Sequence, residues 1–293
     1  MPVKKIFKKF SLDALHWQQT AAGLYNDSYI VTTKDNQYVL RIAPPDDTPQ
    51  LFYEKHMMHS EPNMHSLLRQ HTSIPAPAVC GHDFSRRIID RDYIIMQFLP
   101  GRAGNYDDRE LGQYVAQLHS LTGSVYGYPD RDAPTGREWP ALFLKYAAMI
   151  FADCLQCGVL DKEEHDWFLQ IFKDHQQAIK PVKPSLLHLD LWSQNILTDK
   201  GHITAILDFD RGLYGDPELE FAVLESYGAA TPGFFSGYGQ KRPDSGPAQT
   251  RRILYLVYEL IKYAFIRTAR GGSRSTGRGH VSQCRRILSQ LDN

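Results

Sequence analysis

The sequence LLHLDLWSQNILTDKGHITAILDFD, residues 186–210, decides how this chain is interpreted. Residues 195–198 and 203–207 are β-prone runs, and the turn-forming sequence DKGH joins them. The pattern predicts a β-hairpin. Because its strands are antiparallel, Asn195 and Asp208 would lie at neighbouring open ends, with Asp190 in the loop just upstream.

These three side chains suggest one chemistry. The amide of Asn195 and the carboxylate of Asp208 offer hard oxygen ligands of the kind that Mg²⁺ prefers. Asp190 is then left to orient or deprotonate a hydroxyl group. Taken singly, each aspartate would more often be a turn or cap residue, but their joint spacing around a hairpin favours a functional site.

Composition restricts the class of protein. At 293 residues the chain can bury a sizeable core, in one large domain or two lobes. Its 33 Lys and Arg balance 33 Asp and Glu, so nothing argues for a nucleic-acid partner. No apolar run is long enough to span a bilayer, and the N-terminal sequence MPVKKIFKKF lacks the apolar core of a signal peptide. We expect a cytoplasmic monomer or homodimer that contacts no membrane.

Cysteines and histidines give weaker signals. Cys154 and Cys157 form a lone CxxC within a run whose apolar residues predict one face of a helix. Four histidines surround one helical pattern at irregular spacing, without an HExxH motif: His56, His59, His65 and His71. We expect partly exposed helix residues there rather than zinc ligands.

The first part of the chain predicts a small antiparallel sheet, with strands at 29–33 and 37–42. The preceding segment, 21–28, is rich in turn-forming residues but has a single glycine. It could cover a phosphate group, with Asn26 and Ser28 as candidate contacts.

Arg41 ends an apolar strand, and Val39 shares its face because strand side chains alternate. Arg41 could reach nucleotide phosphates while Val39 lines a base pocket; a solvent-facing strand end is the alternative.

A helical pattern runs from about 53 to 70, and Pro62 predicts a start there, which places Glu61 at the beginning of the helix.

The best lobe boundary follows residues 91–99, which form a strand that is apolar almost throughout. Pro and Gly residues at 100–104 break this strand. We therefore predict an N-terminal lobe at 1–99 and a C-terminal lobe at 100–293.

Helical periodicity dominates the C-terminal lobe, with helices expected at 108–122, 139–157, 163–178, 216–227, 251–270 and 281–291. Asp216 and Pro217 form a typical helix start. Residues 231–247 are rich in Gly, Ser, Pro and aromatics and predict a loop, and the Gly-rich segment 271–279 predicts a mobile connection.

The motif His188-x-Asp190-x-x-x-x-Asn195, followed by Asp208 in ILDFD, resembles the aminoglycoside phosphotransferase and choline kinase-like family. Supporting matches follow in the family order: Tyr38-Val-Leu-Arg41, Glu61 with Leu67 and Leu68, Ile95-Met-Gln-Phe-Leu-Pro-Gly101 and Gly215-Asp-Pro217. The resemblance implies an α+β, bilobal protein-kinase-like fold. It has a small N-terminal antiparallel sheet lobe with a helix and a larger, mostly helical C-terminal lobe.

The resemblance also implies roles. Asp190 would be the catalytic base or orienter, and Asn195 and Asp208 would hold Mg²⁺ on the phosphates of ATP or GTP. His188 would brace the catalytic loop. Leu189 stands where the family usually has glycine, so the backbone conformation of this loop is the feature to compare with the family.

Arg41 would stand where the family more often has a phosphate-contacting lysine, paired with Glu61, although Glu54 is a rival partner. The backbone of the strand end would bind adenine, through Gln97, Phe98 and Leu99. The loop at 21–28, with a single glycine, departs from the family in being glycine-poor.

We therefore predict an ATP- and Mg²⁺-dependent kinase that phosphorylates a hydroxyl of a small molecule, an antibiotic such as an aminoglycoside, an amino alcohol or a sugar. One alternative is a catalytically degenerate kinase-like nucleotide-binding module. Another is a haloacid dehalogenase-type phosphatase with Asp208 as nucleophile. Acidic residues of the second lobe could bind a cationic acceptor or form a solvated surface: Asp107, Asp108, Glu218, Glu220 and Glu225.

Overall fold

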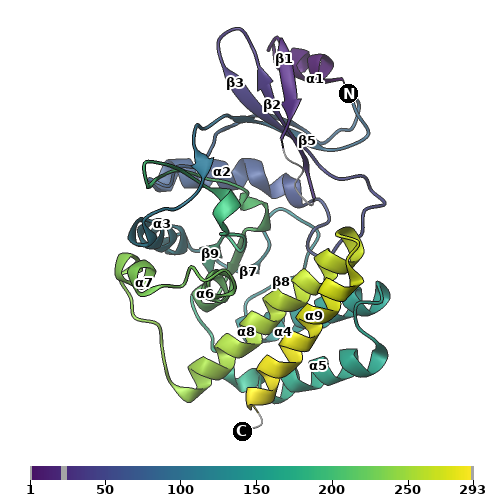
Figure 1. Cartoon of the computed structure of the whole chain (residues 1–293), viewed down its shortest axis with the longest axis vertical. Helices are drawn as coiled ribbons and strands as arrows, with labels where there is room; N and C mark the ends of the chain where they lie inside the picture. Colours follow the sequence, from purple (N-terminus) through teal and green to yellow (C-terminus); the bar gives the residue numbers. More distant parts are fainter. Residues whose placement is uncertain (1, 21–24, 292–293) are drawn as a thin grey trace. The chain divides into compact units, whose positions relative to one another are not determined.

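The computed structural model describes residues 2–20 and 25–291, which form two compact units (Figure 1). Unit 1 comprises Met1–Thr48, His56–Asn105 and Ser193–Asp210. Unit 2 comprises Pro49–Lys55, Tyr106–Trp192 and Arg211–Asn293. These limits differ from those of the predicted lobes, since each unit includes a segment from the other side of the predicted boundary.

Unit 1 contains the expected antiparallel sheet, five strands in the order β1-β2-β3-β5-β4. The strands are β1 (His16–Gln19), β2 (Asp27–Thr32), β3 (Gln37–Ile42), β4 (Val79–Asp83) and β5 (Tyr93–Gln97). Ser28 is opposite Arg41 across β2 and β3, and Val39 is opposite Met96 across β3 and β5.

The two faces of this sheet have different partners. Helix α1 (Val3–Lys9) packs its apolar side chains into a buried cluster with Leu40 and Ile42. Met96 belongs to a second buried cluster, and Val39 packs against it. Because side chains alternate along a strand, Arg41 shares the face of Val39, as predicted.

The predicted hairpin is present in unit 1 as β10 (Ile196–Asp199) and β11 (His202–Ile206). It follows the short 3₁₀ turn η3 (Ser193–Asn195) and precedes η4 (Phe209–Arg211). Strand β10 also pairs with β6 (Arg102–Ala103). The hairpin therefore belongs to unit 1, although it follows the first three α-helices of unit 2 in sequence.

One helix of unit 1 begins where proline predicts. A 3₁₀ turn, η1 (Met57–Ser60), leads into α2 (Glu61–His71), and Pro62 lies in the first turn of α2. Proline is tolerated there because the first N–H groups of a helix have no intrahelical partner. Glu61 is consequently the first residue of α2.

Unit 2 is mostly helical. Its helices are α3 (Asp108–Ser120), α4 (Trp139–Gln156), α5 (Lys162–Asp174), η2 (Gln176–Ala178), α6 (Pro217–Ser226), α7 (Pro232–Tyr238), α8 (Gly246–Phe265), the π-helical η5 (Ile266–Arg270), α9 (Arg274–Leu288) and η6 (Ser289–Leu291). A small sheet has the order β8-β7-β12-β9. Its strands are β7 (Tyr126–Gly127), β8 (Thr135–Gly136), β9 (Ser185–Leu187) and β12 (Leu213–Gly215).

Local sequence explains several helix starts in unit 2. Asp216 caps α6 by accepting the N–H of Glu218 at 3.0 Å, with Pro217 in the first turn, as predicted. Asp161 and Glu164 form a capping box at the start of α5. Within the described part of the chain, no helix is both long and apolar enough to cross a membrane.

The loop predicted for 231–247 is wrong, because α7 lies within it. Glycines of α3 and α7 allow these two helices to pack backbone to backbone. A Cβ atom on Gly237 would overlap the backbone carbonyl group of Arg109, and one on Gly112 would overlap that of Phe234. The glycines that predicted a loop therefore serve close helix packing.

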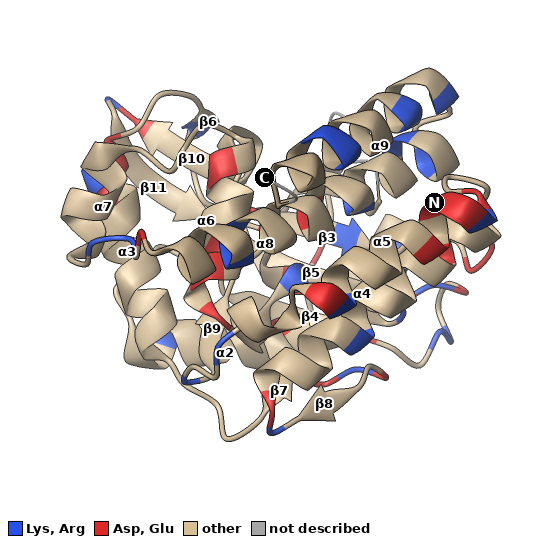
Figure 2. Cartoon of the chain, turned by 90° about the horizontal axis from the view of Figure 1, so that it is seen from below, with Lys and Arg blue, Asp and Glu red and all other residues tan. Residues whose placement is uncertain are grey.

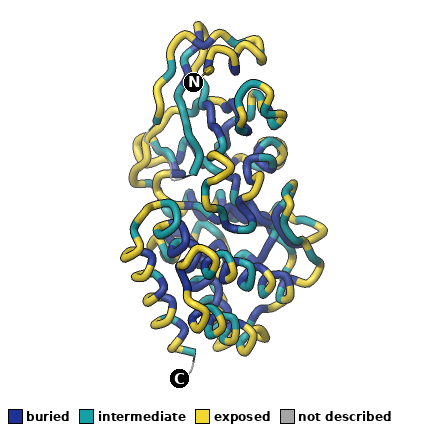
Figure 3. The backbone as a smooth tube through the Cα atoms, turned by 90° about the vertical axis from the view of Figure 1, so that its right-hand side faces the viewer, coloured by how far each residue is buried: buried dark blue, intermediate teal, exposed yellow. Residues whose placement is uncertain are grey.

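The mobile connection predicted for 271–279 is also wrong, because α9 begins at Arg274. Its arginines appear blue in Figure 2, and the buried and exposed residues that follow one another along it can be traced towards the C-terminus in Figure 3. Gly277 is buried, and a Cβ atom there would overlap Thr268 and lie 3.0 Å from the carbonyl oxygen of Ala264.

This packing yields a stability prediction. Gly277→Ala should lower the free energy of unfolding by about 1–3 kcal/mol, because the new methyl group must displace its neighbours. Gly279→Ala is the matched control, since a Cβ atom there meets open space. Gly279→Ala should raise the free energy of unfolding by up to about 1 kcal/mol, because alanine has the higher helix propensity. Urea unfolding compares the two variants, and equal effects would contradict close packing at Gly277.

Candidate active site

In unit 1 the side chain of Arg41 contacts three carboxyl groups. Its Nη1 lies 2.6 Å from Oε2 of Glu61, and its Nη2 lies 2.9 Å from Oδ2 of Asp210. The same Nη2 forms an ion pair with Oδ1 of Asp208. Three segments that are distant in sequence, namely β3, α2 and the residues after β11, therefore meet at one guanidinium.

Arg41 has the partner that the sequence favoured. Glu61 is fully buried and pairs with it, whereas the rival Glu54 belongs to unit 2. Glu54 accepts the N–H of Leu51 at 2.8 Å and pairs with Arg270.

Electrostatics keep the guanidinium of Arg41 charged. Burial on its own lowers the pKa of Arg41, but the carboxylates of Asp208, Glu61 and Asp210 outweigh burial and raise that pKa above its ordinary value. One guanidinium surrounded by three carboxyl groups leaves an excess of acidic groups. Such a cluster has the charge and the oxygen atoms to accept a cation.

Two predicted phosphate contacts lie beside this cluster. Asn26 donates from Nδ2 to Oδ2 of Asp210 at 3.3 Å, and Ser28 lies opposite Arg41 in the sheet. The rest of the predicted phosphate loop, at 21–24, lies outside the described residues.

The predicted metal ligands lie at the open end of the hairpin, as the sequence indicated. The N–H of Leu207 donates to the carbonyl oxygen of Asn195 at 2.9 Å, so the two chain segments run together beyond the strands. Asp208 has φ +65°, a left-handed conformation that is uncommon outside glycine, and its side chain is 36% exposed. An amide oxygen and a carboxylate are the donor set that suits Mg²⁺.

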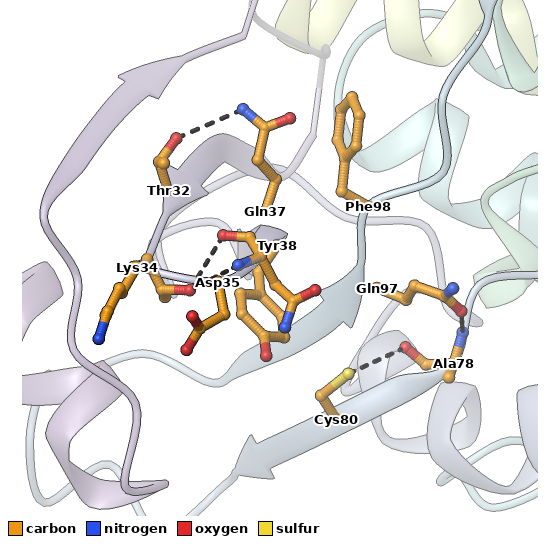
Figure 4. A pocket seen from close by; sticks show the side chains of 11 residues that line it. Thr32, Lys34, Asp35, Gln37, Tyr38, Ala78, Cys80, Gln97 and Phe98 are labelled. Carbon is orange, nitrogen blue, oxygen red and sulfur yellow. Dashed lines mark hydrogen bonds between the residues drawn. The ribbon is translucent and has the colours of Figure 1, made fainter.

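Two of the predicted adenine contacts line a cavity of unit 1. Gln97 and Phe98 line a cavity of about 680 Å³ at the turn end of the β2–β3 hairpin (Figure 4), and Leu99 is half-buried beyond them. Tyr38 also lines the cavity, and its ring contacts Phe7 of α1. Val39 and Arg41 are not among the lining residues, so this cavity is distinct from the Arg41 cluster.

In unit 2 the predicted base, Asp190, is held by an arginine. Nη1 of Arg211 lies 3.1 Å from Oδ1 of Asp190, and both side chains are mostly buried. Burial lowers the pKa of Arg211, but nearby acidic groups, Asp190 first, raise it well above its ordinary value. Arg211 therefore stays charged and fixes the orientation of the Asp190 carboxylate.

The loop of the predicted base is further held by two buried side chains of unit 2. His188, which the resemblance predicts to brace this loop, accepts the N–H of Asp190 on Nδ1 at 3.2 Å. The carboxylate of Glu220, on α6, accepts the N–H groups of His188 and Leu189. Sequence reasoning missed this role of Glu220, because nothing in the spacing of α6 points to the loop.

Leu189 adopts the backbone conformation that the glycine of the family would favour. Its φ is +62°, in the left-handed region, and its side chain is fully buried. This conformation is sterically strained for leucine. The burial of the side chain and the hydrogen bonds to Glu220 offset the strain. The departure from glycine therefore leaves the loop geometry in place.

The acidic residues of unit 2 are engaged in the fold. Glu218 pairs with Arg242 and Arg252, and Glu225 pairs with Arg242. Asp108 accepts from Thr231, and Asp107 caps α3. With Glu220 bonded to the catalytic loop, this set forms neither an open acidic pocket nor a fully solvated surface.

Two exposed aromatic side chains lie in the same unit as Asp190. Trp192 and Tyr227 are 39% and 38% exposed, and their rings stack with centroids 6.5 Å apart at 28°. Burial, followed by the charge of Asp190, raises the pKa of Tyr227 to about 12. No sequence motif predicts this pair, because the two residues lie on different segments of the chain.

Comparison with known proteins identifies the family. Residues 16–252 match the model of the phosphotransferase enzyme family. The chain belongs to this family. The predicted enzyme class, a small-molecule phosphotransferase with an alcohol acceptor, is thereby confirmed.

Two similar proteins carry kinase names. A protein named "Probable ketoamine kinase" from Lactiplantibacillus plantarum is 25% identical over 264 residues, covering 84% of this chain and 86% of that protein. A chloroplastic protein-ribulosamine 3-kinase from Oryza sativa subsp. japonica is 27% identical over 185 residues, covering 58% of this chain and 53% of that protein.

Solved structures share the fold. A candidate fructosamine-3-kinase from Haemophilus somnus 129PT has a TM-score of 0.77 at 18% identity, covering 99% of this chain and 96% of that chain. A thermostable mutant of aminoglycoside phosphotransferase APH(4)-Ia, solved with ADP and hygromycin B, has a TM-score of 0.68 at 18% identity, covering 99% and 98%. The predicted α+β protein-kinase-like fold is confirmed.

The hydrogen bonds of Glu220 to the loop predict that neutralising its carboxylate destabilises the protein more than neutralising another carboxylate on α6. Glu220→Gln should lower the free energy of unfolding by about 1–3 kcal/mol, since an amide cannot accept both backbone N–H groups with a full charge. Glu225→Gln on the same helix is the control and should change it by less than about 1 kcal/mol, because its ion pair is exposed. Equal unfolding curves for the two variants would contradict the bracing role of Glu220.

Proposed function

We propose that this protein is an ATP- and Mg²⁺-dependent kinase that phosphorylates a sugar hydroxyl of a ketoamine. The observation that carries the proposal is the match, over most of both chains, to proteins named ketoamine kinases. The solved complex of a related fold with ADP supports nucleotide use.

Asp190 is the residue proposed to accept the proton of the acceptor hydroxyl. Its carboxylate is oriented by Arg211 through Oδ1, and its backbone N–H is held by His188. A carboxylate fixed in this way can align a hydroxyl for attack on a phosphoryl group.

Asn195 and Asp208 would hold Mg²⁺, with Asp210 and Arg41 around them. The ion, when bound, would neutralise charge on the nucleotide phosphates. Arg41 is the proposed phosphate contact, and its pair with Glu61 fixes the guanidinium from the α2 side. Asn26 and Ser28, beside the same cluster, are proposed to cover the phosphates.

The adenine contacts remain a proposal from the sequence resemblance. The backbone of Gln97, Phe98 and Leu99 would bind the base, with Val39 and the buried Met96 as an apolar surface. Adenine and guanine present different donor and acceptor edges, and the backbone at 97–99 offers both N–H and C=O groups, so ATP and GTP are both proposed donors.

Two features of unit 2 favour a sugar derivative over a polycationic antibiotic. The stacked rings of Trp192 and Tyr227 are partly exposed in the unit that carries Asp190, and aromatic faces suit the apolar side of a sugar ring. The acidic residues that could recognise several amino groups are engaged, as with Glu218 between two arginines.

An acceptor screen tests the proposal. Purified protein with Mg²⁺ and either ATP or GTP should release nucleoside diphosphate in the presence of a hexose or pentose ketoamine of a lysine derivative. Aminoglycosides and choline should give much less. Asp190→Asn should lower kcat by about 10²- to 10⁴-fold without weakening nucleotide binding, since only the proton acceptor is removed.

Three results would contradict the proposal. Turnover of aminoglycosides or choline alone would refute the acceptor class, and wild-type activity in Asp190→Asn would refute the base. Nucleotide binding with no acceptor-dependent release would favour the degenerate binding module.

A further inference from the structure

We propose that His56, His59 and Asp92 of unit 1 form a binding site for a first-row transition metal ion, with Zn²⁺ as the expected occupant. The site uses none of the proposed Mg²⁺ ligands. It does not depend on the acceptor of the kinase reaction.

The ligand atoms already lie near coordination distance of a common centre. Oδ2 of Asp92 is 3.0 Å from Nε2 of His59 and 3.7 Å from Nδ1 of His56, and all three atoms lie within 4.8 Å of one another. Zinc bonds of about 2.0–2.2 Å in a tetrahedron place ligand atoms roughly 3.3–3.6 Å apart. Small side-chain movements would therefore complete three ligands, with water as the fourth.

Backbone geometry explains how two histidines face the same carboxylate. His56 directly precedes the 3₁₀ turn η1 (Met57–Ser60), and the N–H of His59 donates to the carbonyl oxygen of His56 at 2.9 Å, an i→i+3 bond that brings the two residues together. His56 has φ +54° and ψ 29°, a left-handed conformation that is uncommon for histidine. The sequence alone favoured helix residues over zinc ligands here, because Asp92 lies 33 residues beyond His59 and forms no recognisable motif with the histidines.

Neighbouring residues orient the proposed ligands. Arg86 donates from Nε to the second oxygen of Asp92, Oδ1, at 3.1 Å, and leaves Oδ2 facing the histidines. The charge of Arg86 is balanced by Asp46, which lies 2.7 Å from Nη1. The ring of His59 stacks on Phe84 with centroids 4.1 Å apart. Contacts of this kind hold metal ligands in position in known sites.

A simple hydrogen bond accounts for only part of this arrangement. His59 is within hydrogen-bond distance of Asp92, but Nδ1 of His56 at 3.7 Å is too far for one. Two imidazoles and one carboxylate are ligands that suit Zn²⁺ and its neighbours in the first row. Asp92 is buried, whereas both histidines are partly exposed, so an ion could enter from solvent.

The bound ion would have a structural effect close to the Arg41 cluster of the same unit. His59 lies two residues before Glu61, and Asp92 directly precedes β5. A metal bridge would tie the turn that begins α2 to the central sheet. It would thereby limit movement of the helix that carries Glu61.

The test uses the full-length protein after chelator treatment, with excess Mg²⁺ present to fill oxygen-rich sites. Calorimetric titration with Zn²⁺ should show one site. His56→Gln and His59→Gln should each weaken it by more than about tenfold, since each removes a ligand. His71→Gln, at the exposed end of α2, is the matched control and should bind like wild type.

Cobalt substitution identifies the ligand type. Co²⁺ should give visible absorption typical of nitrogen and oxygen ligands, and this absorption should be lost in His59→Gln. No Zn²⁺ binding, or equal binding in all variants, would overturn the proposal. A thiolate charge-transfer band would overturn it as well, because the ion would then be held by an exposed cysteine such as Cys80 or Cys157.

Discussion

The ion pairs of one buried guanidinium hold three segments of unit 1 together. Arg41 joins Glu61 from α2 to Asp208 and Asp210 from the segment after β11. Burying this many charged groups costs free energy unless each has a partner. An arginine can meet several carboxylates at once with its planar, forked donors, whereas a lysine offers a single ammonium. The departure from the lysine of the family therefore fits the acidic surroundings of this position.

A second buried charge organises the loop of the proposed base in unit 2. Glu220 accepts two consecutive backbone N–H groups, and Arg211 holds the carboxylate of Asp190. With these partners the loop keeps a left-handed residue at position 189 without glycine. Preorganised groups of this kind reduce the rearrangement that a reaction requires.

The sequence predicted local features well, because they depend on residues that are close together in the chain. The hairpin at 196–206, the start of α2 at Pro62 and the Asp216 cap all follow from turn and capping preferences. The pair of Arg41 with Glu61 was available only through the family resemblance. Glycines in α7 and α9 were misread, because close helix packing and loop formation favour the same residue.

Other features depend on contacts between distant segments. The attachment of Asp210 to Arg41, the support from Glu220 and the stacking of Trp192 on Tyr227 leave no periodic signal. The convergence of His56 and His59 on Asp92 depends on a 3₁₀ turn that helical periodicity does not distinguish. Physical packing, rather than local preference, decides these positions.

The most direct test of this account is a double-mutant cycle on the free energy of unfolding with Arg41→Met and Glu61→Gln. Removing either partner alone should cost about 3–5 kcal/mol, because buried charges lose their compensation. The double variant should cost less than the sum of the two, by at least about 1 kcal/mol. Additive effects would show that the guanidinium does not couple α2 to the sheet, and would contradict the central role given to Arg41.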